Sequence, residues 1–367
     1  MQQQSKQGGL LGPLLFITCL ILAAIWLSSG SSNQATQSNW VKGWKTVEPL
    51  QLARRAPAAT TYNGFIYVIG GIDANDRYVQ PVEYAAIHKD GTLGPWQQTS
   101  PIIAGRFYNA AIAHNGFIYT LGGGSGDTGK QNYPIASIER ARINPDGSLE
   151  PWQTISQMLS PRRGLKTVIH DSTIYAIGGY DGRFLKSIER TDVQADGSLS
   201  VWQMEQHESV IDRYIHSASI AGDNIYLLGG HMRNPNQASY SDVESSKVTN
   251  RIAGNKQLSP WQIEMHGLQT PRLVAESFSL GQYLYIAGGH TGNQRLNSVE
   301  VAKIDSDGHL HAWRYTSALP VARSAYAATT YKNFVYLIGG GGNSQPLRSV
   351  DMASANLRGE LGYQQHP

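Results

Sequence analysis

GFIYVIGG, residues 64–71, is a short apolar segment that ends in two glycines, and five further copies follow it along the chain. The later copies are GFIYTLGG (116–123), STIYAIGG (172–179), DNIYLLGG (223–230), QYLYIAGG (282–289) and NFVYLIGG (333–340). Successive glycine pairs lie 52, 56, 51, 59 and 51 residues apart. A segment that recurs at a nearly constant interval indicates an internal repeat.

A second marker keeps the same interval. It is a series of tryptophans: Trp44, Trp96, Trp152, Trp202, Trp261 and Trp313. Each unit runs in one order: an arginine followed by small residues, the IYxxGG segment, a segment that opens on an acidic residue, a turn that is usually Asp-Gly, and the tryptophan segment. Asp-Gly favours tight hairpins because such turns need positive φ. Four short strands per unit and six units predict an all-β, six-bladed propeller.

The apolar pattern within each copy fits this architecture. The IYxxGG segments are apolar at successive positions, as expected for a strand that is covered on both faces. A blade between two neighbours is covered in this way. The first strand of each unit contains small residues, which suit the crowded position nearest the axis.

The two ends of the chain leave two arrangements open for the sixth blade. Its repeat has no tryptophan segment after it, whereas Trp44 precedes the first blade. In the favoured arrangement, residues 44–47 cross back and complete the sixth blade, which removes an exposed sheet edge. In the alternative, Gly362-Tyr363 supplies the last strand.

The predicted organisation has four parts: residues 1–9 on the cytoplasmic side, an apolar segment 10–27, a polar linker 28–39, and the propeller 40–367. Eighteen uncharged apolar residues are just long enough to span a bilayer as a helix. An uncleaved signal-anchor is favoured over a cleaved signal peptide, and cleavage before Cys19 as a lipoprotein is a lesser alternative. Lys6 would stay inside, which places the propeller outside the cytoplasm, either membrane-anchored or secreted.

Composition excludes several classes of function. The net charge is only +3, and no basic run marks a nucleic-acid surface. Cys19 is the single cysteine, so the propeller has neither disulfides nor thiolate metal ligands. The chain shows no phosphate-binding loop, zinc-protease motif or nucleophile elbow. No cofactor and no metal site are therefore expected.

The double glycine, the acidic strand, the spaced tryptophan and the arginine together resemble the kelch family from residue 44 to about 357. The resemblance is specific for fold and implies little about function, since kelch propellers include adaptors, sugar-acting enzymes and a copper radical oxidase. That oxidase needs a cysteine cross-linked to a tyrosine. No cysteine follows residue 19, so this chemistry is excluded.

The repeated arginine and acidic residue are predicted to form structural ion pairs at one rim. The antiparallel order of strands brings the start of the first strand to the end of the second and the start of the third. The predicted pairs are Arg54–Glu83, Arg106–Glu139, Arg162–Glu189, Arg213–Glu244, Arg272–Glu300 and Arg323–Asp351. The glycines between them are expected to leave room for each arginine. The rival hypothesis is an arginine ring that binds an anion at the channel mouth.

Candidate functional residues lie where the copies differ. Lys166 and Glu276 are charged at a position, four after the repeat arginine, where the other copies have small residues, and they are the candidates for a catalytic acid/base pair. Their mutual neutralisation in a wet channel is the simpler interpretation. Ligand-binding candidates on the rim are Tyr108, Tyr214, Tyr326, His231, Arg233 and His290, although tyrosines also pack in propellers. Two histidines without a third ligand make a weak metal site.

Two function classes follow. The favoured one is an extracytoplasmic module that binds an envelope protein or glycan and reaches the membrane through its N-terminal segment. The alternative is a sugar mutarotase or epimerase similar to the periplasmic N-acetylneuraminate epimerase, a kelch enzyme with the same overall plan. The catalytic residues of that enzyme cannot be aligned with this chain beyond the repeat itself.

Overall fold

The computed structural model describes residues 40–234, 237–250, 256–342 and 345–365. These residues form strands, turns and loops without a helix. Within them, no helix meets the length and hydropathy needed to cross a membrane. The predicted apolar helix 10–27 and the linker 28–39 lie outside the described residues. The chain divides into two compact units, and the propeller is the unit Lys42–Tyr363.

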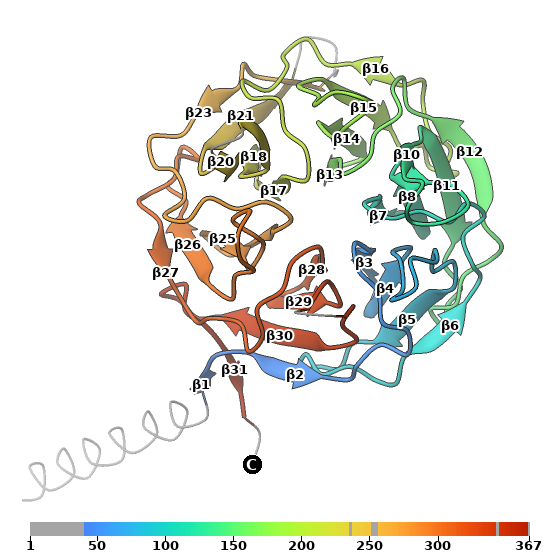
Figure 1. Cartoon of the computed structure of the whole chain (residues 1–367), viewed down its shortest axis with the longest axis horizontal. Coiled ribbons are helices and arrows are strands. Elements are labelled where there is room, and N and C mark those ends of the chain that lie inside the picture. Colours follow the sequence, from blue (N-terminus) through green and yellow to red (C-terminus); the bar gives the residue numbers. More distant parts are fainter. Residues whose placement is uncertain (1–39, 235–236, 251–255, 343–344, 366–367) are drawn as a thin grey trace, which may run out of the picture. The chain divides into compact units, whose positions relative to one another are not determined.

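The propeller has six antiparallel sheets (Figure 1). Blade one comprises β3 (Ala58–Tyr62), β4 (Phe65–Ile69), β5 (Val82–Ala86) and β6 (Gln97–Thr99). Blade two comprises β7 (Ala110–His114), β8 (Phe117–Leu121), β11 (Ser137–Arg142) and β12 (Gln153–Gln157). Blade three comprises β13 (Lys166–His170), β14 (Thr173–Ile177), β15 (Ile188–Asp192) and β16 (Gln203–Met204). Blade four comprises β17 (Ser217–Ala221), β18 (Asn224–Leu228), β21 (Val243–Asn250), β22 (Lys256–Leu258) and β23 (Gln262–Ile263). Blade five comprises β24 (Glu276–Leu280), β25 (Tyr283–Ala287), β26 (Val299–Lys303) and β27 (Arg314–Tyr315).

Blade six joins the two ends of the propeller chain. It comprises β28 (Ala327–Tyr331), β29 (Phe334–Ile338), β30 (Val350–Ala355), β31 (Leu361–Gln364) and β2 (Lys45–Val47). The same sheet includes β1 (Trp40–Lys42), which pairs with β31. Two loop hairpins lie outside the blades, β9 (Gly124–Ser125) with β10 (Tyr133–Pro134) and β19 (His231–Asn234) with β20 (Gln237–Ser239). In every blade the first strand lies nearest the axis and the later strands follow outward (Figure 1). The prediction of an all-β, six-bladed propeller is confirmed.

The two arrangements that the sequence left open for blade six coexist. The first half of β30 pairs with β2, so that Thr46 lies opposite Asp351. The second half of β30 pairs with β31, so that Ser354 lies opposite Gly362. The N–H of Gly43 donates to the carbonyl of Leu361, which links the two segments into one interrupted outer strand. The outer strand of blade six is therefore built from both ends of the propeller chain.

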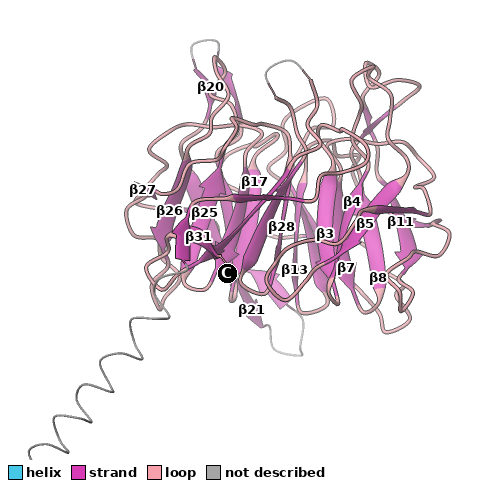
Figure 2. Ribbon diagram, turned by 90° about the horizontal axis from the view of Figure 1, so that it is seen from below, coloured by secondary structure: helices cyan, strands magenta, loops and turns pink. Residues whose placement is uncertain are grey.

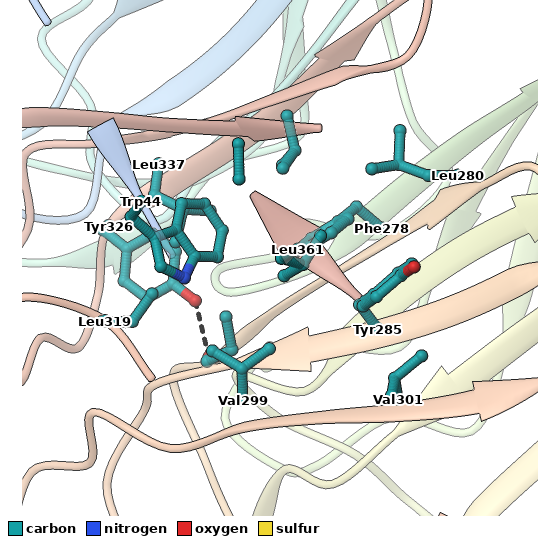
Figure 3. Packing of buried hydrophobic residues seen from close by; sticks show 13 residues of the cluster. Trp44, Phe278, Leu280, Tyr285, Val299, Val301, Leu319, Tyr326, Leu337 and Leu361 are labelled. Atoms are coloured by element: carbon teal, nitrogen blue, oxygen red, sulfur yellow. Dashed lines mark hydrogen bonds between the residues drawn. The ribbon is translucent and has the colours of Figure 1, made fainter. Parts of the chain in front are cut away.

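The hydrophobic core lies between the blades, in six clusters that each join two neighbours. Figure 3 shows the cluster between blades five and six, where Trp44 meets Phe278 edge-on at a ring-centroid distance of 6.4 Å. The indole of Trp44 also donates to the carbonyl of Ser317 in blade five. Trp96, Trp152 and Trp313 make the same bond to the preceding blade. The tryptophan series therefore marks the contacts between blades.

The double glycines are the second contact between blades. The N–H of each second glycine donates to the carbonyl of the next blade's repeat arginine, at 2.8–2.9 Å, and Gly340 closes the circle on Arg54. A Cβ on the first glycine would collide with that same carbonyl; at Gly122 the separation from the carbonyl oxygen of Arg162 would be 2.6 Å. Both glycines also have positive φ in every blade. The main reason for the pair is thus close approach of the neighbouring backbone, not a path for the arginine side chain.

The tyrosine of IYxxGG adds a bond between blades in four copies. Its hydroxyl donates to the carbonyl of the hairpin glycine in the following blade: Tyr67 to Gly147, Tyr119 to Gly197, Tyr226 to Gly308 and Tyr336 to Gly91. Burial raises the pKa of all four phenols, so they stay protonated donors at neutral pH.

We expect Tyr336→Phe to lower the free energy of unfolding by about 1–2 kcal/mol, because it leaves the buried carbonyl of Gly91 without this donor. The midpoint of urea unfolding measures the effect. Tyr133→Phe, at a side chain that is 67% exposed, is the control. Equal midpoints for both variants would show that the hydroxyl bond contributes nothing to ring closure.

Candidate functional site

The structure brings together all six arginine–carboxylate pairs. The guanidinium nitrogen lies 2.5 Å from the carboxylate in Arg54–Glu83 and 2.8 Å away in Arg162–Glu189 and Arg213–Glu244. The remaining three pairs, Arg106–Glu139, Arg272–Glu300 and Arg323–Asp351, are likewise in contact. All twelve side chains are at most 2% exposed. None of these arginines is therefore open to a ligand in the channel.

Each buried pair is satisfied by further hydrogen bonds. Every arginine donates to the carbonyl of the first glycine of its own blade, as Arg162 does to Gly178 at 2.8 Å. Each glutamate accepts two backbone N–H groups from the loop that leads to the arginine; Glu189 accepts those of Leu159 and Ser160. Asp351 is shorter and instead accepts the hydroxyl of Thr46 at 2.7 Å. A buried charge held this way is a structural feature of the blade.

A ring of backbone hydrogen bonds closes around the axis at this rim. It uses the residue two positions after each repeat arginine: Ala56, Tyr108, Gly164, Ile215, Val274 and Ala325. The N–H of each donates to the carbonyl of its counterpart in the preceding blade, at 2.6–3.3 Å, and Ala56 donates to Ala325 to complete the circle. All six have φ between 45° and 63°, which is costly for the β-branched Ile215 and Val274. We name this set the axial ring.

Lys166 and Glu276 meet beneath the axial ring. They start β13 and β24, in blades three and five, and their ammonium and carboxylate groups are in contact across the channel. Both groups line two small cavities, of 30 Å³ on the ring side and 110 Å³ on the other. The first has room for about two water molecules. Pockets for drug-sized ligands usually exceed about 300 Å³, so the spaces beside this partly exposed pair suit water.

Two further polar side chains face the smaller cavity. His216 is 1% exposed, and neither ring nitrogen has a hydrogen-bond partner among the described residues. The amide oxygen of Asn109 is also buried and unpaired in this part of the chain. Burial lowers the pKa of His216 well below its usual value, and Arg213 and Lys166 lower it further. The imidazole is therefore neutral, and ordered water is the natural partner for these groups.

The Lys166–Glu276 pair predicts a pH dependence. Burial raises the pKa of Glu276 above its ordinary 4.5, while Lys166 opposes that shift. The folded protein therefore binds this proton more tightly than the unfolded chain does, so stability falls as pH rises from 4.5 through the raised pKa.

We expect Glu276→Gln to remove this contribution. As pH rises from about 4.5 to 7, the urea midpoint of the parent should fall relative to that of the variant, because only the parent loses the contribution of Glu276. The exposed Glu150→Gln variant should show a constant difference. A constant difference for Glu276→Gln would mean that the carboxylate titrates as it does in the unfolded chain.

Aromatic side chains gather on the rim outside the axial ring. Tyr214 lies with its ring centroid 5.5 Å from those of Tyr180 and Phe184, and Phe184 is 5.4 Å from His231. The guanidinium of Arg163 lies 4.8 Å from the centroid of Tyr180 and 5.4 Å from that of Tyr214, within cation–π range. All five side chains are partly exposed. We name this set the rim cluster.

Loops from two blades flank the rim cluster. In the loop that contains β9 and β10, Asn132 accepts hydrogen bonds from Arg163, and the carbonyl of Gln131 accepts the hydroxyl of Tyr78 in blade one. In blade four the hairpin β19–β20 carries His231, and β20 lies at the outermost part of this rim in Figure 2. Tyr108 packs on Phe107 at 5.0 Å, which extends the aromatic surface toward Tyr78.

The structure separates the ligand-binding residues that the sequence grouped together. Tyr108 belongs to the axial ring and Tyr214 to the rim cluster, and both are partly exposed. Tyr326 is 1% exposed and lies in the cluster between blades five and six (Figure 3). Its hydroxyl donates to the carbonyl of Ala287 and accepts the N–H of Glu276. Tyr326 therefore packs between blades five and six, beside the smaller cavity and not on the rim, which corrects its predicted position. The three tyrosines differ because they stand two, one and three positions after their arginines.

The predicted histidines are not brought together. His231 packs on Phe184, and its Nδ1 lies 3.0 Å from the carbonyl of Ala238. His290 Nδ1 accepts the N–H of Gly292 in its own loop. The side chain of Arg233 lies outside those described. Over the described ranges, no three His, Cys, Asp or Glu side chains are grouped as metal ligands.

Sequence reasoning missed Arg163, Tyr180 and Phe184. Arg163 directly follows a repeat arginine, Tyr180 directly follows a double glycine, and the two residues form an antiparallel bridge. The same bridge forms between Tyr214 and His231 in blade four. Comparing these two positions across the copies would have revealed large polar and aromatic residues in neighbouring blades.

The fold, the repeat contacts and the satisfied arginine pairs define a class: the chain is a kelch-repeat β-propeller. The family model described as Kelch motif matches residues 161–194 and 275–301.

Known proteins are similar at low identity. Beta-scruin of Limulus polyphemus is 24% identical over 295 residues, 78% of this chain and 30% of that protein. Kelch-like protein 38 of Mus musculus is 21% identical over 280 residues, 76% of this chain and 43% of that protein. The chain thus spans less than half the length of these relatives. The solved "Structure of YjhT" matches with a TM-score of 0.67 and 14% identity, over 87% of this chain and 99% of that one, and supports the fold alone.

Proposed function

We propose that the propeller is a binding module that holds a protein or glycan on the rim formed by the loops after the double glycines. One observation carries this proposal: the partly exposed rim cluster surrounds Arg163, whose Nε is buried and has no hydrogen-bond partner among the described residues. Aromatic side chains and arginine are the groups that dominate binding energy at protein interfaces, and aromatic faces also stack on sugars. Kelch propellers generally act as protein-binding modules.

We also propose an extracytoplasmic location, with the apolar segment 10–27 as an anchor or signal peptide and the partner in the cell envelope. The motivation is the uncharged apolar run preceded by Lys6. Protease treatment of intact cells and spheroplasts tests this location. We expect the protease to digest the propeller in intact cells if it is on the cell surface, and in spheroplasts if it lies behind an outer barrier. Digestion only after cell lysis would contradict it.

The alternative, a sugar mutarotase or epimerase that uses Glu276 and Lys166, is disfavoured by the mutual pairing of the two charges and by the small spaces beside them. The two charges neutralise each other, and the adjoining cavities of 30 and 110 Å³ are small for a hexose. Anomer exchange of sialic acid and simple hexoses, followed by NMR with the propeller fragment 40–367, decides the matter. We expect no acceleration; acceleration that Glu276→Gln abolishes would establish the enzyme.

The binding proposal is tested with the same fragment, because the core clusters of the propeller contain only residues 44–361. A ligand is first selected from glycan arrays and envelope extracts, and its dissociation constant is then measured for variants. We expect Arg163→Ala and Phe184→Ala each to weaken binding by about tenfold or more. Lys89→Ala, at an exposed hairpin on the opposite rim, is the control. If only the Lys89 variant lost binding, the binding site would lie on the opposite rim and the proposal would be wrong.

A further inference from the structure

The outer strand of blade two differs from its counterparts. β12 has five residues, whereas the strands that directly follow the tryptophan in the other blades have two or three: β2, β6, β16, β23 and β27. Its sequence, Gln153-Thr154-Ile155-Ser156-Gln157, carries no charge. Its only strand partner among the described residues is β11, and it lies at the perimeter of the propeller (Figure 1). Exposed sheet edges are normally short or protected by charges, and this edge has neither protection.

A groove of 680 Å³ runs beside β12 toward blade three. Thr154, Ser156 and Gln157 line one side of it, and Val201 and Trp202 line the other. Val201 is 82% exposed, and Leu159 at the end of the groove is 55% exposed. The exposed apolar side chains make the groove a surface that a partner would cover.

Trp202 adds a buried polar group to the groove. Four of the six repeat tryptophans donate their indole N–H to a carbonyl of the preceding blade, such as Trp152 to Ser100. The counterpart of Ser100 in blade two is Ser156, which instead pairs with Ile138 in the extended strand. Trp202 is 4% exposed, and its Nε1 has no acceptor among the described residues. Among the described residues the Nε1 of Trp261 is likewise unpaired, beside the two-residue β16, so the unpaired donor of Trp202 is a property of the groove and not a consequence of the length of β12.

We propose that β12 pairs antiparallel with β12 of a second copy of this chain. The strand is nearly palindromic, so pairing centred on Ile155 places Gln153 opposite Gln157, Thr154 opposite Ser156 and Ile155 opposite itself. This register has no like-charge contact, which is the electrostatic condition for a two-fold, self-complementary edge. A β-bulge leaves Ile155 without a partner on β11, so its backbone groups are not committed to that ladder.

The second copy would complete the groove. Its Gln153 lies opposite Gln157 and so enters the groove, where an amide oxygen can accept the N–H of Trp202. A foreign peptide could add a strand to the same edge, but the matched, uncharged register favours a second copy. A contact of this length falls in the small-interface class, so we expect a weak dimer, with a dissociation constant in the micromolar range.

Sedimentation equilibrium of fragment 40–367 tests the proposal, since this fragment lacks the apolar segment 10–27. We expect a monomer–dimer equilibrium. Gln153→Lys with Gln157→Lys puts lysines opposite each other at both ends of the pair and should raise the dissociation constant at least about tenfold. Gln97→Lys with Gln98→Lys, at exposed positions of β6, should leave it unchanged.

A mixing experiment identifies the register. The double lysine variant at positions 153 and 157 and the corresponding double glutamate variant should each be mainly monomeric, and their mixture should form a heterodimer because opposite charges then face each other. A monomeric parent fragment up to the millimolar range, or dimerisation unaffected by the lysine variant, would overturn the proposal. A monomer that binds an extended peptide along β12 would assign the edge to a foreign partner instead.

Discussion

Arg162→Met should lower the free energy of unfolding by about 3–5 kcal/mol, the largest effect we expect for a single substitution. Arg162 makes five hydrogen bonds, two to Glu189, two to Ser187 and one to Gly178, at 2.8–3.0 Å. Its removal leaves the carboxylate of Glu189 buried, with only two backbone N–H groups as partners. The midpoint of urea unfolding, followed by tryptophan fluorescence, measures the loss.

Two further variants separate the ion pair from general damage. Arg183→Met, in the same blade at a side chain that is 78% exposed, should change stability by less than about 0.5 kcal/mol. The double variant Arg162→Met with Glu189→Gln should be less destabilised than the sum of its single substitutions, because no charge is then left unpaired. Strict additivity would show that the two side chains do not act as a pair.

Gly122→Ala should lower stability by about 2–4 kcal/mol, for two reasons. Gly122 has a φ of 56°, and a Cβ there would lie 2.6 Å from the carbonyl oxygen of Arg162 and 2.9 Å from the side chain of Met158. Relief of the collision would push blades two and three apart, which also strains the bond from Gly123 to the same carbonyl.

The other end of β8 supplies a matched control. Gly116 has a φ of 80° but no atom within 4 Å of the position a Cβ would take. Gly116→Ala therefore reports only the conformational cost, about 1–2 kcal/mol. The difference between the two variants measures the close approach of the blades. Equal losses would mean that positive φ alone explains the double glycine.

Repetition made much of the fold accessible from the sequence. In a repeat protein, equal offsets from a marker place residues at equivalent points of each blade. The offset of four residues from the arginine thus brought Lys166 and Glu276 to the channel, and the strand order brought each arginine to its carboxylate. The blade number followed directly from the count of IYxxGG copies.

The other features of the site depend on contacts that cannot be predicted from residue type. The axial ring is made of backbone atoms, and its six residues share an offset and a positive φ but no common residue type. Tyr326 was misplaced because a one-residue change in offset turns a side chain from the rim into the gap between blades. The rim cluster lies at positions where the residue type varies among the copies, so only the structure shows which of them are neighbours.

The axial ring has a consequence for how such a protein can evolve. Its six hydrogen bonds all run in one rotational sense, and each residue is both donor and acceptor, so the circuit has no free end. Loss or duplication of a single repeat would break this circuit. The ring could close again only after every remaining blade had changed its orientation to fit a different number of units. The blade count should therefore be inherited as a whole, while the loops outside the circuit are free to diverge and to acquire new ligands.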